Sequence, residues 1–213
     1  MKRKWKLWMI AFVLFVMTDI MMQSNRAEAK KRTFTVSPKT IPCSSSYRQK
    51  PYYNKKTKQY YMINSYMRRL STTGGTLKLK KGTYKIPGTI YVPSNVKIVC
   101  ANGVKIKKTK ATGTKKVKST KFLFQMISEE KASGKQNTGK YAASKNASIQ
   151  GNGKVIFDMG NVNGATAVFV GHASGITVSG VRFRNKKGGS YIWIEGSKNI
   201  SVRQCVFERK KDV

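Results

Sequence analysis

Side chains able to perform acid–base or metal chemistry are scarce in this sequence. The chain has 213 residues, with 43 Lys and Arg against 8 Asp and Glu, and a single His. The candidate catalytic residues are Asp158, Glu195 and His172, because carboxyl and imidazole groups are common general acids and bases. One His excludes any site that needs two, such as an H-E-x-x-H zinc site. Three Cys residues are too few for a disulfide scaffold, and we assign no metal ligands.

Each candidate also has a structural alternative. Asp158 follows the apolar run V-I-F and precedes Met-Gly-Asn, which is typical of an Asp that caps a turn. His172 has no carboxylate partner that the sequence reveals, so packing at a turn is its alternative role. Glu195 ends an apolar run and could act as an acid or ligate calcium. Glu208 follows Arg184 at the spacing of the internal repeat described below, and stacking at that period would make them an ion pair.

Basic and aromatic side chains gather near the C-terminal end of the sequence. The candidate substrate-binding residues are Arg182, Arg184, Lys186, Lys187, Tyr191, Trp193 and Arg203. Arginine can fork onto the carboxylates of an acidic sugar chain, and aromatic rings can stack on sugars. The spacing of two puts Tyr191 and Trp193 on one face of a strand, toward either a ligand or the core. A solvated surface is the alternative for the basic residues.

The net charge of +35 predicts partners of opposite sign. Acidic polysaccharide, anionic cell-wall polymer and nucleic acid all qualify, and charge alone does not choose among them. No recognisable nucleic-acid-binding motif occurs, so we expect only incidental, salt-sensitive binding of nucleic acid.

The N-terminus has the layout of a secretory signal peptide over residues 1–29. Basic residues precede the apolar segment 7–17, and Ala27-Glu28-Ala29 matches the small-x-small cleavage pattern. Asp19 interrupts the apolar run before it reaches the ~20 residues of a spanning helix, which disfavours the alternative of a retained anchor. We expect cleavage after Ala29 and no membrane span in the mature protein. We also expect the protein to be secreted and extracellular, with association to a cell wall as a further option.

Hydrophobic periodicity divides the rest of the chain. Residues 30–58 lack clear periodicity and are expected to form an irregular basic arm. Apolar residues three and four apart predict a helix over 59–70, ended by Gly74-Gly75. Beyond it the period changes to two, with Gly and Pro between short strands. A Lys-rich insertion over 107–147 interrupts the strands; we expect one strand at 122–127, with a disordered loop as the alternative for the remainder.

An internal repeat indicates the architecture. The segment 175–183 returns as 199–207 without a gap, and we take this spacing as one coil. A weaker pair, 95–106 and 146–157, has about twice that spacing, which we interpret as two coils. Leu77 also aligns with Val96, at the shortest spacing of the three. Short strands that repeat roughly every 19 to 25 residues predict an all-β parallel β-helix over residues 59–213, with the helix as its N-terminal cap.

Two segments resemble a known group of proteins. The stretch GGTLKLKKGTYKIPGTIYVPSNVKI, from Gly74, resembles the opening coils of the pectate-lyase-like superfamily. The segment IQGNGKVIFD, from Ile149, is similar to polygalacturonase-type β-helices. The resemblance implies a right-handed parallel β-helix that recognises acidic polysaccharide. It implies calcium as the cofactor of a lyase, or Asp residues around N-T-D and D-D motifs in a hydrolase. Neither of these motifs occurs here, nor does R-I-K.

The sequence thus supports two functional hypotheses. The first is a secreted carbohydrate-active β-helix that acts on or binds a pectin-like polyuronate, as a polysaccharide lyase or glycoside hydrolase when full length. The second is a non-catalytic basic solenoid for adhesion or cell-wall binding. No capping helix follows the strand that ends at Phe207, so we expect a fragment that lacks the catalytic coils and is inactive by itself.

Overall fold

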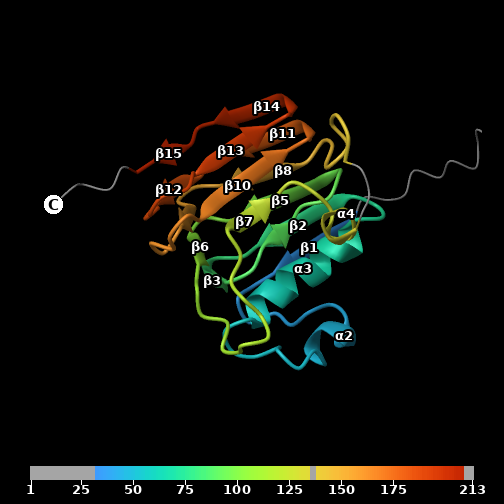
Figure 1. Ribbon diagram of the computed structural model, residues 1–213, viewed down its shortest axis with the longest axis vertical. Coiled ribbons are helices and arrows are strands. Elements are labelled where there is room, and N and C mark those ends of the chain that lie inside the picture. The colour runs from blue at the N-terminus through green and yellow to red at the C-terminus, as the bar shows by residue number, and fades with distance from the viewer. Residues whose placement is uncertain (1–31, 135–137, 209–213) are drawn as a thin grey trace, which may run out of the picture. The chain divides into compact units, whose positions relative to one another are not determined.

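A computed structural model describes residues 32–134 and 138–208. The predicted signal peptide, residues 1–29, lies outside the described residues. The strands form three sheets, which we number I, II and III and whose strands are given below. The chain passes repeatedly from sheet I to sheet II to sheet III (Figure 1). Every pairing of neighbouring strands in these sheets is parallel. The fold is the right-handed parallel β-helix that the sequence predicts, with one pass through the three sheets as one coil.

Each sheet takes one strand from each successive coil. Sheet I contains β1 (Arg32–Val36), β2 (Gly75–Leu79), β5 (Val96–Cys100), β8 (Ser148–Gly151), β11 (Ser174–Ser179) and β14 (Lys198–Arg203). Sheet II contains β3 (Gly82–Ile86), β6 (Val104–Lys108), β9 (Ile156–Asp158), β12 (Arg182–Arg184) and β15 (Val206–Phe207). Sheet III contains β4 (Ile90–Tyr91), β7 (Phe122–Gln125), β10 (Thr166–Gly171) and β13 (Ile192–Glu195).

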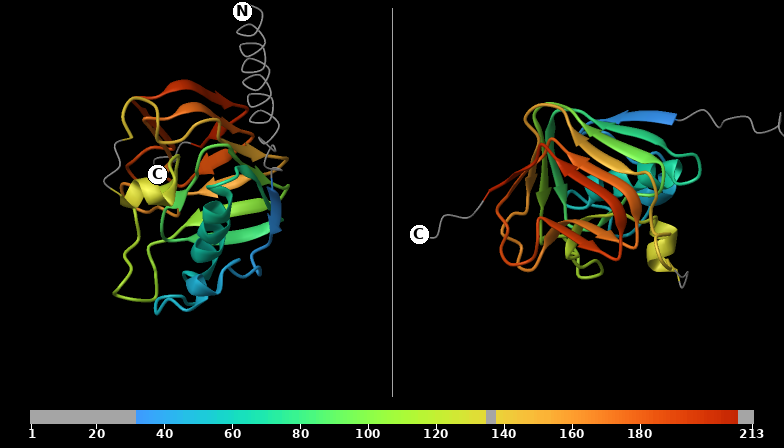
Figure 2. Two further views of the ribbon diagram at one scale, coloured as in Figure 1. Left: turned by 90° about the vertical axis from the view of Figure 1, so that its right-hand side faces the viewer. Right: turned by 90° about the horizontal axis from the view of Figure 1, so that it is seen from above.

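The three sheets enclose the interior of the solenoid (Figure 2). Ladders of buried apolar side chains fill this interior. One ladder of sheet I consists of Leu77, Ile98, Ile149, Val178 and Val202, which are partners in consecutive strands. The first four are fully buried, whereas Val202, in the last described coil, is 38% exposed. The interior is therefore a stack of like residues, each coil covering the previous one.

The strand register corrects two of the predicted coils. Ile98 pairs directly with Ile149, so the wide spacing between these segments is one coil with an insertion and not two coils. Leu77 pairs with Ile98 and not with Val96, so the earlier coil is longer than its alignment predicts. The alternating pattern does not reveal this second error, because shifting the alignment of two strands by two residues leaves the same side chains pointing inward. The repeat of 175–183 as 199–207 is confirmed as one coil, since Val178 pairs with Val202.

Helix α3 (Lys58–Leu70) matches the predicted helix and covers the N-terminal end of the coils. Met62, Ile63 and Met67 on its apolar face are buried, and the helix packs against β2, β3 and β4. It ends where the amide of Gly74, at φ +65°, donates to the carbonyl oxygen of Leu70 over 2.8 Å. None of the helices formed by the described residues is long and apolar enough to cross a membrane.

The expectation of an irregular arm over residues 30–58 is wrong for part of that segment. Strand β1 (Arg32–Val36) is the first strand of sheet I and pairs with β2. A short helix, α2 (Ser45–Arg48), follows. Only Phe34 and Val36 carry the alternation of β1, and two apolar residues are too few to mark a strand in sequence.

The insertion over 107–147 is more ordered than expected. Its predicted strand is β7, which belongs to sheet III between β4 and β10. The sequence did not predict helix α4 (Glu129–Ser133), whose N-cap Ser128 accepts a hydrogen bond from the Lys131 amide. The insertion thus completes a coil instead of interrupting the solenoid.

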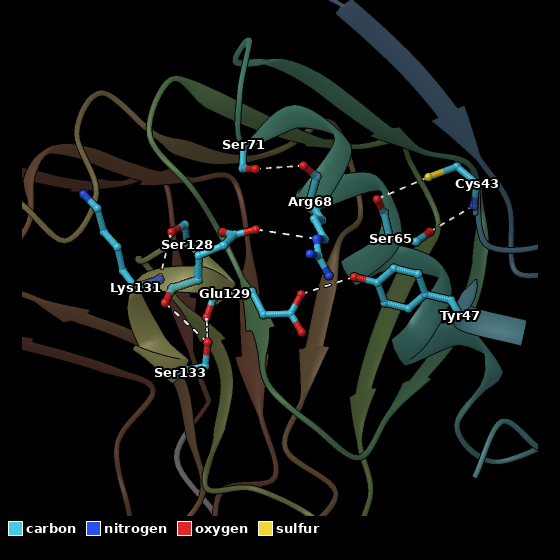
Figure 3. A network of polar contacts seen from close by, with 10 residues as sticks. Cys43, Tyr47, Ser65, Arg68, Ser71, Ser128, Glu129, Lys131 and Ser133 are labelled. Carbon is cyan, nitrogen blue, oxygen red and sulfur yellow. Dashed lines mark hydrogen bonds and ion pairs between the residues drawn. The ribbon is translucent and has the colours of Figure 1, made fainter. Parts of the chain in front are cut away.

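Polar contacts join helix α4 to the N-terminal cap (Figure 3). The Tyr47 hydroxyl donates to Glu129 Oε2 over 3.2 Å, and Arg68 Nε lies 3.7 Å from Glu130 Oε1. Nearby, the Cys43 amide donates to Ser65 Oγ over 3.0 Å. Residues 82 positions apart in sequence are therefore held together across the cap.

Candidate polyanion-binding face

Sheet II alternates apolar and basic side chains. One ladder of its inward residues comprises Tyr84, Ile106, Phe157, Phe183 and Phe207. The residues between them point outward, because successive side chains of a strand lie on opposite faces. Five of these outward residues are basic, and we call their surface the basic face. The basic face consists of Lys85, Lys105, Lys107, Arg182 and Arg184.

The basic face is organised in two columns that run from coil to coil. The first column is Thr83, Lys105, Ile156, Arg182 and Val206. The second column is Lys85, Lys107, Asp158 and Arg184. Neighbouring strands of a sheet lie ~4.8 Å apart, so the cations of several coils can contact one extended anionic chain. Among the described residues, Lys85 and Lys107 form no ion pair, which leaves both ammonium groups available.

Asp158 is buried within the second column, with only 3% of its surface exposed. Its carboxylate lies 2.9 Å from Lys105 Nζ and 3.4 Å from Arg184. It also accepts hydrogen bonds of 2.9 Å from Asn185 Nδ2 and from the Gly160 amide. Burial alone would raise the pKa of Asp158, but these hydrogen bonds and the charge of Lys105 lower it to about 2. Asp158 is thus an ionised, fully paired carboxylate that caps a turn, as its sequence context allows.

The ion pairs around β12 differ from the predicted one. Arg184 pairs with Asp158, its register partner one coil earlier, and not with Glu208. Glu208 instead lies 3.1 Å from Arg182 Nη1. The coil repeat brings Glu208 to this face, but Arg184 forms its ion pair with the more deeply buried carboxylate of Asp158.

An open groove of ≈ 670 Å³ adjoins the basic face at the corner between sheets I and II. Its lining includes Lys154, Arg182, Arg184, Gln204 and Glu208, together with the backbone of three corner glycines. At this corner four residues connect β8 to β9, but only two connect β11 to β12 and two connect β14 to β15. The groove lies where the connection becomes shorter. A polymer lying along the basic face would therefore meet a hollow lined with cations.

The three candidate catalytic residues lie at two separate corners. His172 follows β10 at the corner between sheets III and I, with φ +49° and Nδ1 3.3 Å from the Lys140 carbonyl oxygen. Glu195 ends β13 at the same corner, and its carbonyl oxygen accepts a 3.0 Å hydrogen bond from the His172 amide. Asp158 ends β9, where the chain turns from sheet II to sheet III. The fold does not bring all three together, and a catalytic role for any of them stays a prediction.

The described residues do not fit a calcium site of the kind that a lyase would use. Calcium takes six to eight oxygen ligands, including several carboxylates. No group of three or more His, Cys, Asp or Glu residues lies close together in ranges 32–134 and 138–208. The buried carboxylate of Asp158 already faces Lys105 and Arg184, whose charges oppose a cation.

The other predicted binding residues are spread over the molecule. Arg203 ends β14 in sheet I, and Lys186 and Lys187 lie exposed between β12 and β13. Only Arg182 and Arg184 of the predicted set belong to the basic face. The fold therefore divides the predicted set among different surfaces.

The rings of Tyr191 and Trp193 do not share a face. Tyr191 precedes β13, where strand alternation does not apply, and it is 8% exposed. Its ring packs near Phe183, and its hydroxyl donates to the Glu208 carbonyl oxygen over 2.7 Å. Trp193 is 46% exposed and contacts Phe169, with ring centroids 5.1 Å apart. Tyr191 is a core residue, whereas Trp193 is an exposed residue beside Phe169.

Sequence reasoning missed Lys85, Lys105, Lys107 and Lys154, which belong to earlier coils. The signal was present, because Lys85 and Lys105 each lie between two apolar residues of a strand, and Lys107 follows Ile106 at the next alternate position. Their relation to Arg182 requires the coil register, which the interpretation of one long coil as two coils obscures.

Comparisons with known proteins support the fold. No protein-family model matches the sequence, and no match was found among curated proteins. A similar solved structure is that of PfbA, described as a surface adhesin of Streptococcus pneumoniae, with a TM-score of 0.51 and 16% sequence identity. The match covers 73% of this chain and 36% of the PfbA chain, so this chain spans about a third of that structure. The likeness concerns the β-helix, and membership of the pectate-lyase-like superfamily stays a prediction.

Proposed function

We propose that this protein is a non-catalytic, extracellular adhesion solenoid that binds an acidic polysaccharide or anionic cell-wall polymer through its basic face. The observation that carries the proposal is the register of cations on β3, β6 and β12, which are aligned through β9. Lys85 and Lys107 form no ion pair among the described residues. The adhesin with a similar fold supports adhesion over catalysis. The dispersed positions of Asp158, His172 and Glu195 support it as well.

Binding of this kind depends on salt. Exposed charges are screened beyond a Debye length, which is ~10 Å at 0.1 M salt. A groove lined by cations concentrates an anionic polymer near the surface and accelerates its association. We therefore expect retention on acidic polymers at low salt and release at high salt, with no retention on a neutral polysaccharide.

The test compares two double variants of equal charge. Lys85→Ala/Lys107→Ala removes two register partners from the basic face, whereas Lys78→Ala/Lys97→Ala removes two lysines from the outer side of sheet I. We expect the first pair to weaken binding of polygalacturonate about three- to tenfold at low salt, since each exposed ionic contact is worth up to about 1 kcal/mol. The second pair should weaken it much less. Equal losses in both variants would contradict a specific face.

The same incubations test the absence of catalysis. Lyase activity would generate unsaturated sugars that absorb in the ultraviolet, and hydrolysis would generate new reducing ends. We expect neither product on polygalacturonate with or without calcium. Turnover by this chain that exceeds a heat-denatured control would contradict the non-catalytic proposal.

A further inference from the structure

The groove beside the basic face already holds a carboxylate. Glu208 Oε1 lies 3.1 Å from Arg182 Nη1, and both residues line the groove. The backbone of Glu208 is fixed at two points, because its amide donates to the Phe183 carbonyl oxygen over 2.9 Å and its own carbonyl accepts from Tyr191 over 2.7 Å. These two hydrogen bonds fix the backbone of Glu208 beside Arg182, whereas its carboxylate is held by the ion pair with Arg182.

This ion pair is weakly held and open to solvent. The side chains of Arg182 and Glu208 are 48% and 37% exposed. Exposed pairs of this type change an equilibrium constant by no more than about fivefold. The Asp158 carboxylate differs, because it is buried and has four polar partners. Of the two carboxylates on this face, only that of Glu208 can be replaced at low cost.

We propose that Glu208 stands in for an acidic ligand, and that a carboxylate of a bound polyuronate displaces it from Arg182. The inference rests on the proposed function and adds its ligand chemistry, a carboxylate, and its contact point, the groove. An ionised carboxylate on Arg182 is the same chemical group as a uronate, so the internal pair marks where a ligand carboxylate binds. The hollow of ≈ 670 Å³ lies in the range of ~300–1,000 Å³ that is usual for small-molecule sites.

The experiment measures affinity for oligogalacturonate at low salt with two single variants of equal charge. Glu208→Gln frees Arg182, while Glu195→Gln removes an exposed carboxylate that has no ion pair among the described residues. We expect Glu208→Gln to bind about two- to fivefold tighter than Glu195→Gln. Equal affinities would overturn the inference, since the gain would then come from net charge.

A second pair of variants locates the effect. In an Arg182→Gln background, Glu208→Gln should give no more gain than Glu195→Gln. A persistent extra gain would show that Arg182 is not the contact, and it would overturn the inference. Polyglycerol phosphate serves as a second probe, and a larger gain from Glu208→Gln on this polymer than on oligogalacturonate would contradict carboxylate recognition.

These outcomes are distinct from failure of the proposed function. If the unaltered protein binds none of these polymers at low salt, the proposed function fails and the inference fails with it. If binding depends on Lys85 and Lys107 but Glu208→Gln behaves as Glu195→Gln, only the inference fails. Thermal melts of each variant confirm that the exposed substitutions leave the fold intact.

Discussion

The ammonium nitrogen of Lys108 lies 2.8 Å from the carbonyl oxygen of Phe122, inside the coil. The side chain of Lys108 is fully buried at an inward position of β6. It also donates to the carbonyl oxygens of Pro87 and Gly88 over 3.0 and 3.2 Å, and to Thr120 Oγ1 over 3.3 Å. A lysine thus takes the place of an apolar ladder residue and binds together the turns that enter sheet III.

Lys108→Met should alter how stability depends on pH. Burial lowers the pKa of Lys108 to about 7, whereas a lysine in an unfolded chain titrates near about 10.4. Between these values the unfolded state binds more protons, so the free energy of unfolding should rise with pH by up to about 1.4 kcal/mol per pH unit. Urea denaturation at several pH values between about 7 and about 9.5 should show this rise in the parent and its loss in Lys108→Met. Lys107→Met, on the outer side of the same strand, should keep it.

Asp158→Asn should reduce the free energy of unfolding by roughly 1–3 kcal/mol at neutral pH, because it removes two ion pairs from a buried site. The pKa of Asp158 is lowered to about 2, so its stabilising contribution is complete above about pH 4 and is lost as the pH falls toward about 2. Chemical denaturation at neutral and acidic pH should therefore show the parent and the variant converging in acid. A constant difference would mean that the carboxylate charge is not the cause.

Gly180→Ala, at the corner that lines the groove, should lower the stability of the protein more than Gly164→Ala does. Both glycines have φ of +67°, so a side chain strains the backbone equally, by about 1 kcal/mol. At Gly180 the added Cβ would also lie 2.3 Å from the Gly151 carbonyl oxygen, while at Gly164 nothing lies within 4 Å. Thermal denaturation of both variants measures the difference. Equal melting temperatures would show that the corner backbone shifts freely.

Asn64→Ala should weaken the attachment of the cap helix by about 2–4 kcal/mol, because its removal leaves buried backbone groups without partners. Asn64 is 3% exposed, and its amide donates to the Thr89 carbonyl oxygen over 3.0 Å and accepts from the Tyr91 amide over 3.2 Å. Gln59, on the same helix, makes comparable hydrogen bonds at a partly exposed position, where water can replace them. Gln59→Ala should therefore cost about 1 kcal/mol or less, and a similar loss in both variants in urea denaturation would contradict this account.

The sequence pattern predicted the solenoid because its physical cause is local. A strand with one buried face repeats apolar residues at a spacing of two, and stacked coils repeat them at the coil length. Val178 and Val202 therefore revealed a correct coil. The same logic failed for Ile98 and Ile149, because their separation in sequence does not show whether the chain between them forms two coils or one coil with an insertion.

The candidate site was predicted only in part for a related reason. Alternation shows that Arg182 and Arg184 point outward, but it does not show which cations of other coils join them. That depends on register, which places Lys107 beside Asp158 and Lys85 beside Lys107. Side-chain competition then decided the ion pairs, since Arg184 reaches the buried Asp158 and leaves Glu208 to Arg182.

The sequence by itself determined the positive charge, the strand period, the cap helix and the scarcity of carboxylates. These properties follow from composition and from contacts between residues near in sequence. The tertiary structure alone decided which residues lie together: the columns of the basic face, the groove at the shortened corner, and the buried ammonium of Lys108. Each of these depends on pairing between coils that are distant in sequence and unequal in length, and register is a property of the folded stack.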